Sequence, residues 1–161
     1  MTVDIYDAVT NDIPEIRELI KAILTTRYDA DKVTHLMKRV YSVDSLQKTL
    51  DSENRHLIVA IIEDAIVGVC QYGIPIMDDC DCEDLRSLQF LFVHPDAVHD
   101  DIASALVYDV EETIDEEARV QRLSVFVKQN MLPLIKFYAG LGFVHDQVED
   151  IDDEWYMEKY L

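Results

Sequence analysis

The side chains best suited to chemistry gather in an acidic run near the middle of the chain. The run comprises Asp78, Asp79, Cys80, Asp81, Cys82, Glu83 and Asp84. Carboxylates and thiolates bind metal ions, and clustered carboxylates attract cationic molecules. A run of charges is also typical of a solvated loop. Three interpretations therefore stay open: a loop, a surface that attracts a cationic substrate, and a metal site.

A metal centre finds little further support in the sequence. The Cys80/Cys82 pair lacks the second pair expected of a zinc site, and Cys70 makes the cysteine count odd. No close pairing typical of metal sites occurs among the five histidines, His35, His56, His94, His99 and His145. We therefore predict no metal, and the cysteines suit a reduced cytosolic setting.

The net charge restricts the partners. The chain has 33 acidic against 14 basic residues, a formal charge of −19. Such a field repels nucleic acids and anionic membrane surfaces and favours amines, polyamines or lysine-bearing chains. A cytoplasm kept at high salt is another explanation, because a heavily carboxylated surface stays hydrated there and its self-repulsion is screened.

Targeting and membrane-spanning segments are not evident. No apolar run approaches eighteen residues, and the first residues lack the basic and apolar regions of a signal peptide. We expect a soluble, cytoplasmic protein.

Hydrophobic periodicity predicts the helices that must position these groups. Apolar residues at three- and four-residue spacing form one stripe over 13–24, and Thr10, Asn11 and Asp12 offer capping side chains just before Pro14. A second helical region, broken in the middle, is expected at 32–40 and 44–50. Further helices are expected at 102–118 and at 132–139.

Strands are predicted from β-branched and alternating residues. They lie at 2–8, 56–62, 65–74, 88–93, 122–127 and 155–161, with another before the last. The element order is β-α-α-β-β-β-α-β-α-β-β. With 161 residues, 49% of them hydrophobic, the chain suits a single α/β domain spanning 1–161.

Three segments of the second half follow one another as a strand end, a helix interior and a helix end. They are Val93-His94-Pro95, Ser104-Ala105-Leu106 and Phe137-Tyr138-Ala139-Gly140-Leu141-Gly142-Phe143. Together they resemble consecutive signatures of the GNAT superfamily of N-acetyltransferases, and the first half agrees in element order. The resemblance implies a mixed, mostly antiparallel sheet of about seven strands flanked by about four helices.

The resemblance also implies acetyl-CoA as co-substrate. In the family, a loop carrying an Arg or Gln and glycines surrounds the CoA pyrophosphate at a helix N-terminus. The matching run is Val98, His99, Asp100, Asp101, Ile102 and Ala103. Only Ala103 fits the family pattern. By the same resemblance, main-chain groups of Leu91, Phe92 and Val93 contact the acetyl and pantetheine amides, and Asn130 resembles the pantetheine-binding asparagine, one residue out of register.

The two aspartates of this loop oppose cofactor binding. At a few ångströms and an effective dielectric near 20, each carboxylate–phosphate pair costs roughly 4 kcal/mol before screening. Carboxylates that point to solvent, a divalent cation, high salt or a protonated His99 would each reduce this cost. Alternatively, Asp100 and Asp101 simply cap the helix and complement its positive end.

The family reaction is a direct attack of an amine on the thioester. Tyr138 matches the family tyrosine that protonates the departing thiolate, and its alternative role is packing. Gln89 stands where many relatives carry a glutamate that acts as the general base, and glutamine cannot act as a base. Asp84, Glu83 and His94 remain as candidate bases. We predict an N-acetyltransferase for a small-molecule or peptide amine. The alternative is a GNAT-fold binding or regulatory module with weak or no CoA binding; a homodimer would be common for this fold.

Overall fold

The computed structural model describes residues 2–75, 83–117 and 119–161, and at residues 98–100 the course of the backbone. One seven-stranded sheet has the order β1-β2-β3-β4-β5-β7-β6. The chain divides into two compact parts, Met1–Gln71 with Phe90–Asp109 and Tyr72–Gln89 with Val110–Leu161. Strands β3 and β4 contribute residues to both parts, so each part is described by itself.

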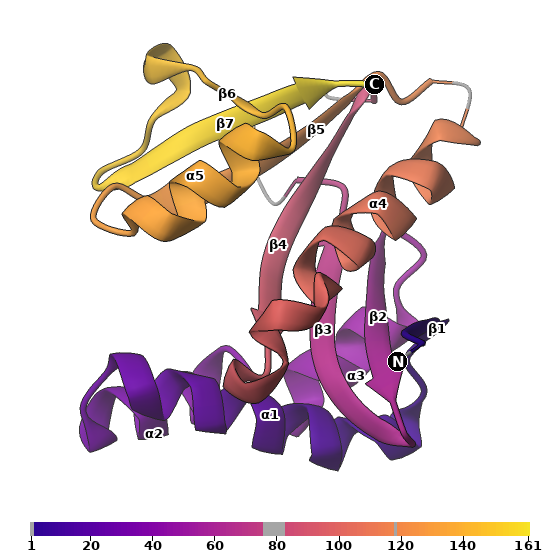
Figure 1. Ribbon diagram of the computed structural model, residues 1–161, viewed down its shortest axis with the longest axis vertical. Helices are drawn as coiled ribbons and strands as arrows, with labels where there is room; N and C mark the ends of the chain where they lie inside the picture. Colours follow the sequence, from indigo (N-terminus) through magenta and orange to yellow (C-terminus); the bar gives the residue numbers. More distant parts are fainter. Residues whose placement is uncertain (1, 76–82, 118) are drawn as a thin grey trace. The chain divides into compact units, whose positions relative to one another are not determined.

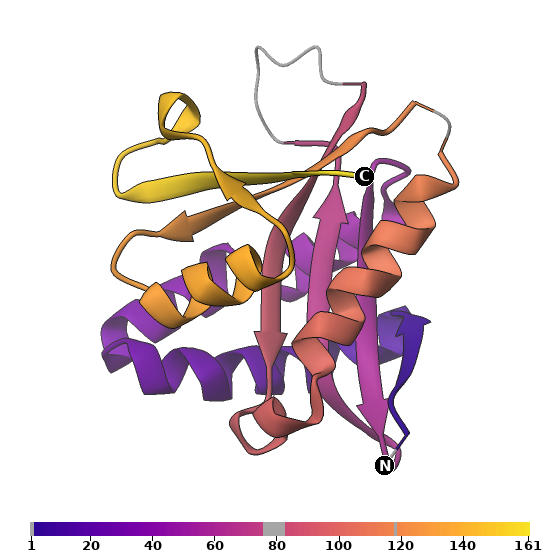
Figure 2. The ribbon, with the colours of Figure 1, turned by 45° about the horizontal axis from the view of Figure 1, so that its top comes forward.

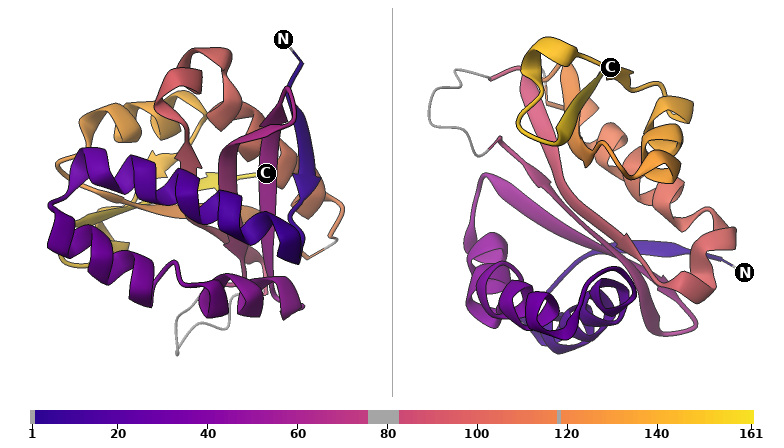
Figure 3. Two further views of the ribbon diagram at one scale, coloured as in Figure 1. Left: turned by 90° about the horizontal axis from the view of Figure 1, so that it is seen from below. Right: turned by 90° about the vertical axis from the view of Figure 1, so that its left-hand side faces the viewer.

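The first part combines three strands with a layer of helices. Strand β1 (Asp4–Asp7) pairs antiparallel with β2 (Arg55–Ile62), and β3 (Ala65–Gly73) follows β2 after two residues. Helices α1 (Ile13–Arg27), α2 (Ala30–Arg39) and α3 (Val43–Asp51) lie along one face of these strands (Figure 3). The first turns of α4 (Ile102–Asp115) lie on the other face (Figure 2).

Helix α1 buries the stripe that its sequence predicts. Its buried side chains are Ile13, Ile16, Leu19, Ile20, Ile23 and Leu24. They share a core with Val33 and Met37 of α2 and with Leu57, Val59 and Val69 of the sheet. One local expectation was wrong: the Asp12 carboxylate does not cap α1 but accepts from the Val9 N–H (2.9 Å), because Thr10–Asp12 forms a separate 3-10 turn.

The expected broken helical region consists of two helices, which raises the α-helix count of the described residues to five. Each helix has its own cap. The Asp29 carboxylate accepts from the Lys32 N–H (2.8 Å) at the start of α2, and the Ser42 hydroxyl accepts from the Ser45 N–H (3.1 Å) at the start of α3. Such caps satisfy N–H groups that a helix leaves unpaired.

Close packing at Gly68 positions the beginning of α4. A Cβ atom added at Gly68 would lie 2.9 Å from Ile102 Cγ2 and 3.1 Å from Leu106 Cδ1. Ile102 and Leu106 are both fully buried. The bare glycine backbone therefore lets α4 approach strand β3 where the helix begins.

The second part is a strand layer covered by one helix. Here β4 (Leu85–Val93) pairs parallel with β5 (Arg122–Lys128), and β5 pairs antiparallel with β7 (Glu154–Tyr160), which also pairs with β6 (Val144–His145). Helix α5 (Leu132–Gly140) runs alongside β5 and β7 (Figure 1). The mixed seven-stranded α/β sheet is confirmed.

Left-handed backbone conformations occur at four described residues other than glycine, and all four are acidic. Glu63 and Asp64, with φ of 50° and 65°, form the two-residue turn between β2 and β3. Asp101 (54°) precedes α4, and Asp152 (52°) lies before β7. Aspartate tolerates this region better than most residues, whereas glycine enters it without steric cost.

None of the helices in the described part of the chain is long and apolar enough to cross a membrane.

Candidate active site

The residues expected to contact the CoA arm through their main chain form the end of β4. Leu91 and Val93 are half-buried, and the Phe92 side chain is buried in the core of the first part. There its ring meets Tyr41 edge to face at 5.5 Å. The side chain of Phe92 is thus occupied in packing, and the role expected of this strand concerns only its main chain.

The expected pyrophosphate loop folds as a 3-10 turn, Pro95–Asp100, followed directly by α4. Val98, His99 and Asp100 belong to this turn. Asp101 links it to Ile102, the first residue of α4, and its carbonyl accepts the first helical hydrogen bond, from Ala105 N–H (3.0 Å). The N–H groups of the first helical turn, including Ala103, therefore have no partner of the ordinary i−4 kind.

Asp101 occupies the position where the backbone favours glycine. Its φ and ψ are 54° and 30°, and its side chain is exposed. The loop thus keeps a left-handed residue and a helix N-terminus, the two backbone features that suit an anion. However, the carboxylate of Asp101 at this position opposes the binding of an anion.

Tyr138 and Asn130 belong to the second part. Asn130 is exposed in the turn between β5 and α5, where Met131 N–H donates to Lys128 O (2.9 Å). Tyr138 is 2% exposed on α5, and its ring meets Phe137 and Phe143 edge to face at 5.0 and 5.4 Å. The packing role of Tyr138 is therefore visible in the structure, and a role as general acid stays a proposal.

The family-like segment at residues 137–143 ends α5 in a specific geometry. Gly142 has φ of 99°, its N–H donates to Ala139 O (3.0 Å), and Phe143 N–H donates to Tyr138 O (3.1 Å). These two bonds with a left-handed glycine define a Schellman motif, and the Tyr138–Phe143 ring contact is its usual hydrophobic partner. The spacing of Tyr, Gly and Phe thus follows from how the helix ends.

A pocket of about 280 Å³ opens on one face of strands β4, β5 and β7 in the second part. Its walls are Pro75, Leu85, Ser87, Leu88, Gln89, Ser124, Phe126, Glu154 and Tyr156. The strand register explains why these side chains meet. Ser87 pairs with Ser124, and Phe126 pairs with Tyr156. Paired residues point to the same face, and Gln89 and Glu154 follow two positions away on their strands.

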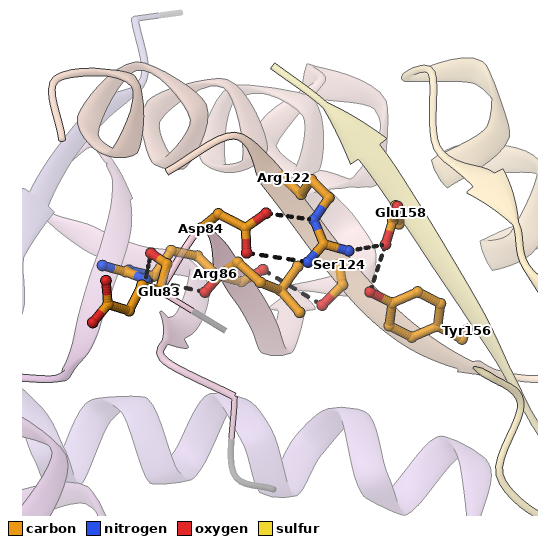
Figure 4. A network of polar contacts seen from close by, with 8 residues as sticks. Glu83, Asp84, Arg86, Arg122, Ser124, Tyr156 and Glu158 are labelled. Atoms are coloured by element: carbon orange, nitrogen blue, oxygen red, sulfur yellow. Dashed lines mark hydrogen bonds and ion pairs between the residues drawn. The ribbon is translucent and has the colours of Figure 1, made fainter. Parts of the chain in front are cut away.

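A polar network borders the pocket around Arg122 (Figure 4). Nε and Nη2 of Arg122 donate to the two Asp84 oxygens (3.0 and 3.2 Å), and Nη1 donates to Glu158 Oε2 (3.1 Å). The Tyr156 hydroxyl donates to the same Glu158 oxygen (2.7 Å). One guanidinium therefore holds one carboxylate from the start of β4 and another from β7.

This network sets the protonation states of Asp84 and Tyr156. The hydrogen bond from Arg122 holds the pKa of Asp84 below its ordinary value. Burial raises the pKa of the Tyr156 phenol, and the hydrogen bond to Glu158 raises it further. Near neutral pH, Asp84 is a carboxylate and Tyr156 is a neutral hydrogen-bond donor.

The candidate bases differ in their availability. Asp84 is bound by Arg122, which makes it a weak base; Glu83 lies 3.2 Å from Arg119 in an exposed ion pair. In the first part, His94 Nδ1 accepts from Asp96 N–H (3.1 Å). Gln89 lines the pocket, and its amide donates to Ile74 O (3.2 Å), so it connects the chain after β3 to β4.

Glu154 is the pocket residue that sequence reasoning missed. It is half-buried on the wall, and no hydrogen bond or ion pair of its carboxylate is found among the described residues. The alternation Glu154, Tyr156, Glu158 at the start of β7 would have indicated one shared face. The register that brings this face to Phe126 and Ser124 was not available from the sequence.

A larger pocket of about 540 Å³ lies between α1 and α2 in the first part. Its charged wall residues are three cations, Arg17, Lys21 and Lys38, and one acid, Glu18. Arg17 is committed to the fold, because it donates to Tyr41 O (3.0 Å) and Met37 O (3.3 Å). The cationic wall makes this groove unsuitable for the expected amine.

Most of the acidic run, including Cys80 and Cys82, lies outside the described residues. Its last members, Glu83 and Asp84, form the ion pairs given above. Cys70 is buried, and burial raises the pKa of its thiol. Within the ranges that the structure covers, no three His, Cys, Asp or Glu side chains gather as a metal site.

Comparison with known proteins places this architecture. The acetyltransferase (GNAT) domain family matches residues 24–157. The PaiA N-acetyltransferase of Thermoplasma acidophilum, solved in complex with coenzyme A, superposes with a TM-score of 0.84 at 16% identity, covering 100% of both chains. The ribosomal-protein-alanine N-acetyltransferase of Brucella melitensis gives 0.76 at 18% identity, covering 98% of this chain and 99% of its own.

At these identities the solved structures establish the fold. No curated protein sequence matched the chain. The family match spans α2 to β7 and includes the expected cofactor loop, Tyr138 and the pocket on β4, β5 and β7. The chain belongs to the GNAT acetyltransferase family.

Proposed function

We propose that the protein transfers an acetyl group from acetyl-CoA to a primary amine, in a small molecule, a polyamine or a lysine-like group. The observation that carries this proposal is the family match over residues 24–157. The net charge of −19 and the half-buried carboxylate of Glu154 support a cationic acceptor.

The reaction is a single displacement at the thioester. The amine, having lost one proton to solvent or to a base, attacks the acetyl carbonyl carbon, so that a C–N bond forms and the C–S bond breaks. The thiolate leaves with the electron pair and takes a proton. Tyr138 supplies this proton in the proposal, with main-chain groups of Leu91, Phe92 and Val93 and the amide of Asn130 holding the CoA arm.

The pyrophosphate is assigned to residues 98–103. The first-turn N–H groups of α4 favour the anion, and the exposed Asp101 carboxylate opposes it by roughly 4 kcal/mol at 4 Å and an effective dielectric of 20. Salt reduces this repulsion, because the Debye length falls from about 10 Å at 0.1 M to about 3 Å at 1 M. We therefore expect acetyl-CoA to bind more tightly as the salt concentration rises.

The second candidate is a binding or regulatory module that has lost catalysis. Two observations favour it: the carboxylate at the left-handed position before α4, and the 2% exposure of Tyr138. Both are compatible with a fold kept for another purpose, since a carboxylate at this position opposes a phosphate and the ring of Tyr138 is occupied in packing.

Titration with acetyl-CoA decides between the two. We expect wild type to bind below millimolar concentrations in 1 M KCl and more weakly in 0.1 M KCl, and Asp101→Asn to bind about ten-fold more tightly in 0.1 M KCl. Thiol release with a panel of amines then measures transfer. Absence of binding under both salt conditions, or binding without transfer to any amine, would establish the module instead.

A further inference from the structure

We propose that the Glu154 carboxylate binds the ammonium group of a small acceptor amine inside the pocket on β4, β5 and β7, and that it is the specificity-determining residue for a cationic acceptor. That the bound amine is an acetyl acceptor rests on the proposed function.

The carboxylates around the pocket differ in their partners. Asp84 and Glu158 both receive hydrogen bonds from Arg122, and Glu158 receives another from Tyr156. Both carboxylates therefore have hydrogen-bond partners within the fold, and Arg122 balances one of their two charges. Glu154 faces the same pocket without such a partner among the described residues.

Leaving the Glu154 carboxylate in this position without a cation costs free energy. A half-buried carboxylate loses hydration, and a cation that enters the pocket recovers part of that loss. Lys128 is the β5 residue in register with Glu154. No hydrogen bond or ion pair of the Glu154 carboxylate occurs among the described residues, so this carboxylate is available to an ammonium group that enters the pocket.

The remaining walls of the pocket are apolar and aromatic. Leu85 is a buried apolar side chain, and the rings of Phe126 and Tyr156 meet at 5.3 Å, 63° apart. Aromatic faces attract cations and also accept an apolar body. The volume of about 280 Å³ lies at the small end of ligand pockets. The pocket therefore fits a small primary amine with an apolar body.

Gln89 is a polar but uncharged residue of the same pocket. Its amide is held by Ile74 O and it stands on the pocket wall, two residues along β4 from Ser87. A glutamine there supplies hydrogen bonds without charge. The β4 wall of the pocket thus carries no charge at Gln89, and the negative charge comes from Glu154 on β7.

The test uses phenethylamine as the probe and its neutral counterpart 2-phenylethanol as the comparison. Binding is followed by NMR through the backbone amides of Phe126 and Tyr156, in the full chain and without acetyl-CoA. We expect Glu154→Gln to raise the dissociation constant for phenethylamine at least ten-fold and to leave 2-phenylethanol unchanged. Glu154→Asp should recover part of the loss.

Glu112→Gln is the matched control, because it makes the same charge change at an exposed position of α4. It should leave binding within two-fold of wild type. Equal affinity of wild type and Glu154→Gln, absence of binding, or equal loss in the Glu112→Gln control would overturn the inference.

The two proposals fail separately. If phenethylamine binds in a Glu154-dependent manner and acetyl-CoA does not bind, the amine site stands and the transferase function is wrong. If acetyl-CoA binds and other amines are acetylated independently of Glu154, the function stands and the assignment of Glu154 is wrong.

Discussion

The backbone N–H of Phe143 donates to the carbonyl of Tyr138 over 3.1 Å, and the rings of the same two residues meet edge to face at 5.4 Å. Two residues of the most family-like segment are thus joined by both backbone and side chain. The contact gives Tyr138 a structural role through its ring. Phenylalanine at this position would keep that ring contact.

The first prediction concerns the Tyr138 hydroxyl. Tyr138→Phe keeps the ring contacts, and if Tyr138 protonates the thiolate we expect kcat to fall about 10²-fold in a variant that still unfolds cooperatively on heating. The measurement is thiol release at saturating acetyl-CoA. Tyr108→Phe, at a 50% exposed tyrosine of α4, is the control. Unchanged kcat in Tyr138→Phe would leave Tyr138 a packing residue.

The second prediction contrasts two glycines that lie two residues apart. Gly142→Ala places a Cβ at φ of 99°, 3.3 Å from Lys159 Cε, and should lower the free energy of unfolding by about 1–2 kcal/mol. Gly140→Ala meets nothing within 4 Å in a helical position and should raise it by about 0.5–1 kcal/mol. Urea unfolding of both variants checks the pair; equal effects would contradict the assigned ending of α5.

The third prediction concerns the pH dependence of stability at Asp84. Because Arg122 holds the folded-state pKa of Asp84 below its unfolded value of about 3.9, the carboxylate stabilises the fold above that pH. The contribution is lost as the pH falls through the folded-state pKa. Asp84→Asn should therefore be less stable than wild type at pH 7, and the difference should close below about pH 4.

Glu83→Gln controls for the charge change in that experiment. Its carboxylate is 71% exposed and pairs with a 79% exposed Arg119, so the pair contributes little. Thermal unfolding of wild type and both variants between pH 2.5 and 7 makes the comparison. If Asp84→Asn and Glu83→Gln have the same pH profile, the Asp84–Arg122 contact has no special weight.

Much of the architecture could be predicted from local sequence. The α1 stripe, the β2–β3 hairpin and the ending of α5 each depend on residues close together in the chain, where periodicity and turn chemistry are decisive. The break between α2 and α3 was expected, but the two helices were counted as one element, although Asp29 and Ser42 are typical caps of separate helices. Because of the 3-10 turn before α1, the Asp12 carboxylate accepts from the Val9 N–H instead of capping α1, and the composition of the segment does not reveal this.

The pocket was beyond such reasoning because it depends on pairing between distant strands. Phe126 meets Tyr156, and Ser87 meets Ser124, only in one register. Candidate bases chosen by position along the chain therefore included Asp84, which Arg122 occupies, and omitted Glu154. Glu154 could not be identified from the sequence, because its place on the pocket wall depends on the register between β5 and β7.

The four acidic residues in left-handed conformations affect the unfolded chain as well as the folded one. Glu63, Asp64, Asp101 and Asp152 each adopt a backbone region that is costly for a residue with a Cβ atom. In return, each restricts the unfolded ensemble more than glycine would, so that less conformational entropy is lost on folding. The scarcity of glycine, four in 161 residues, thus exchanges entropy for strain, and the acidity of this protein extends into its tight turns.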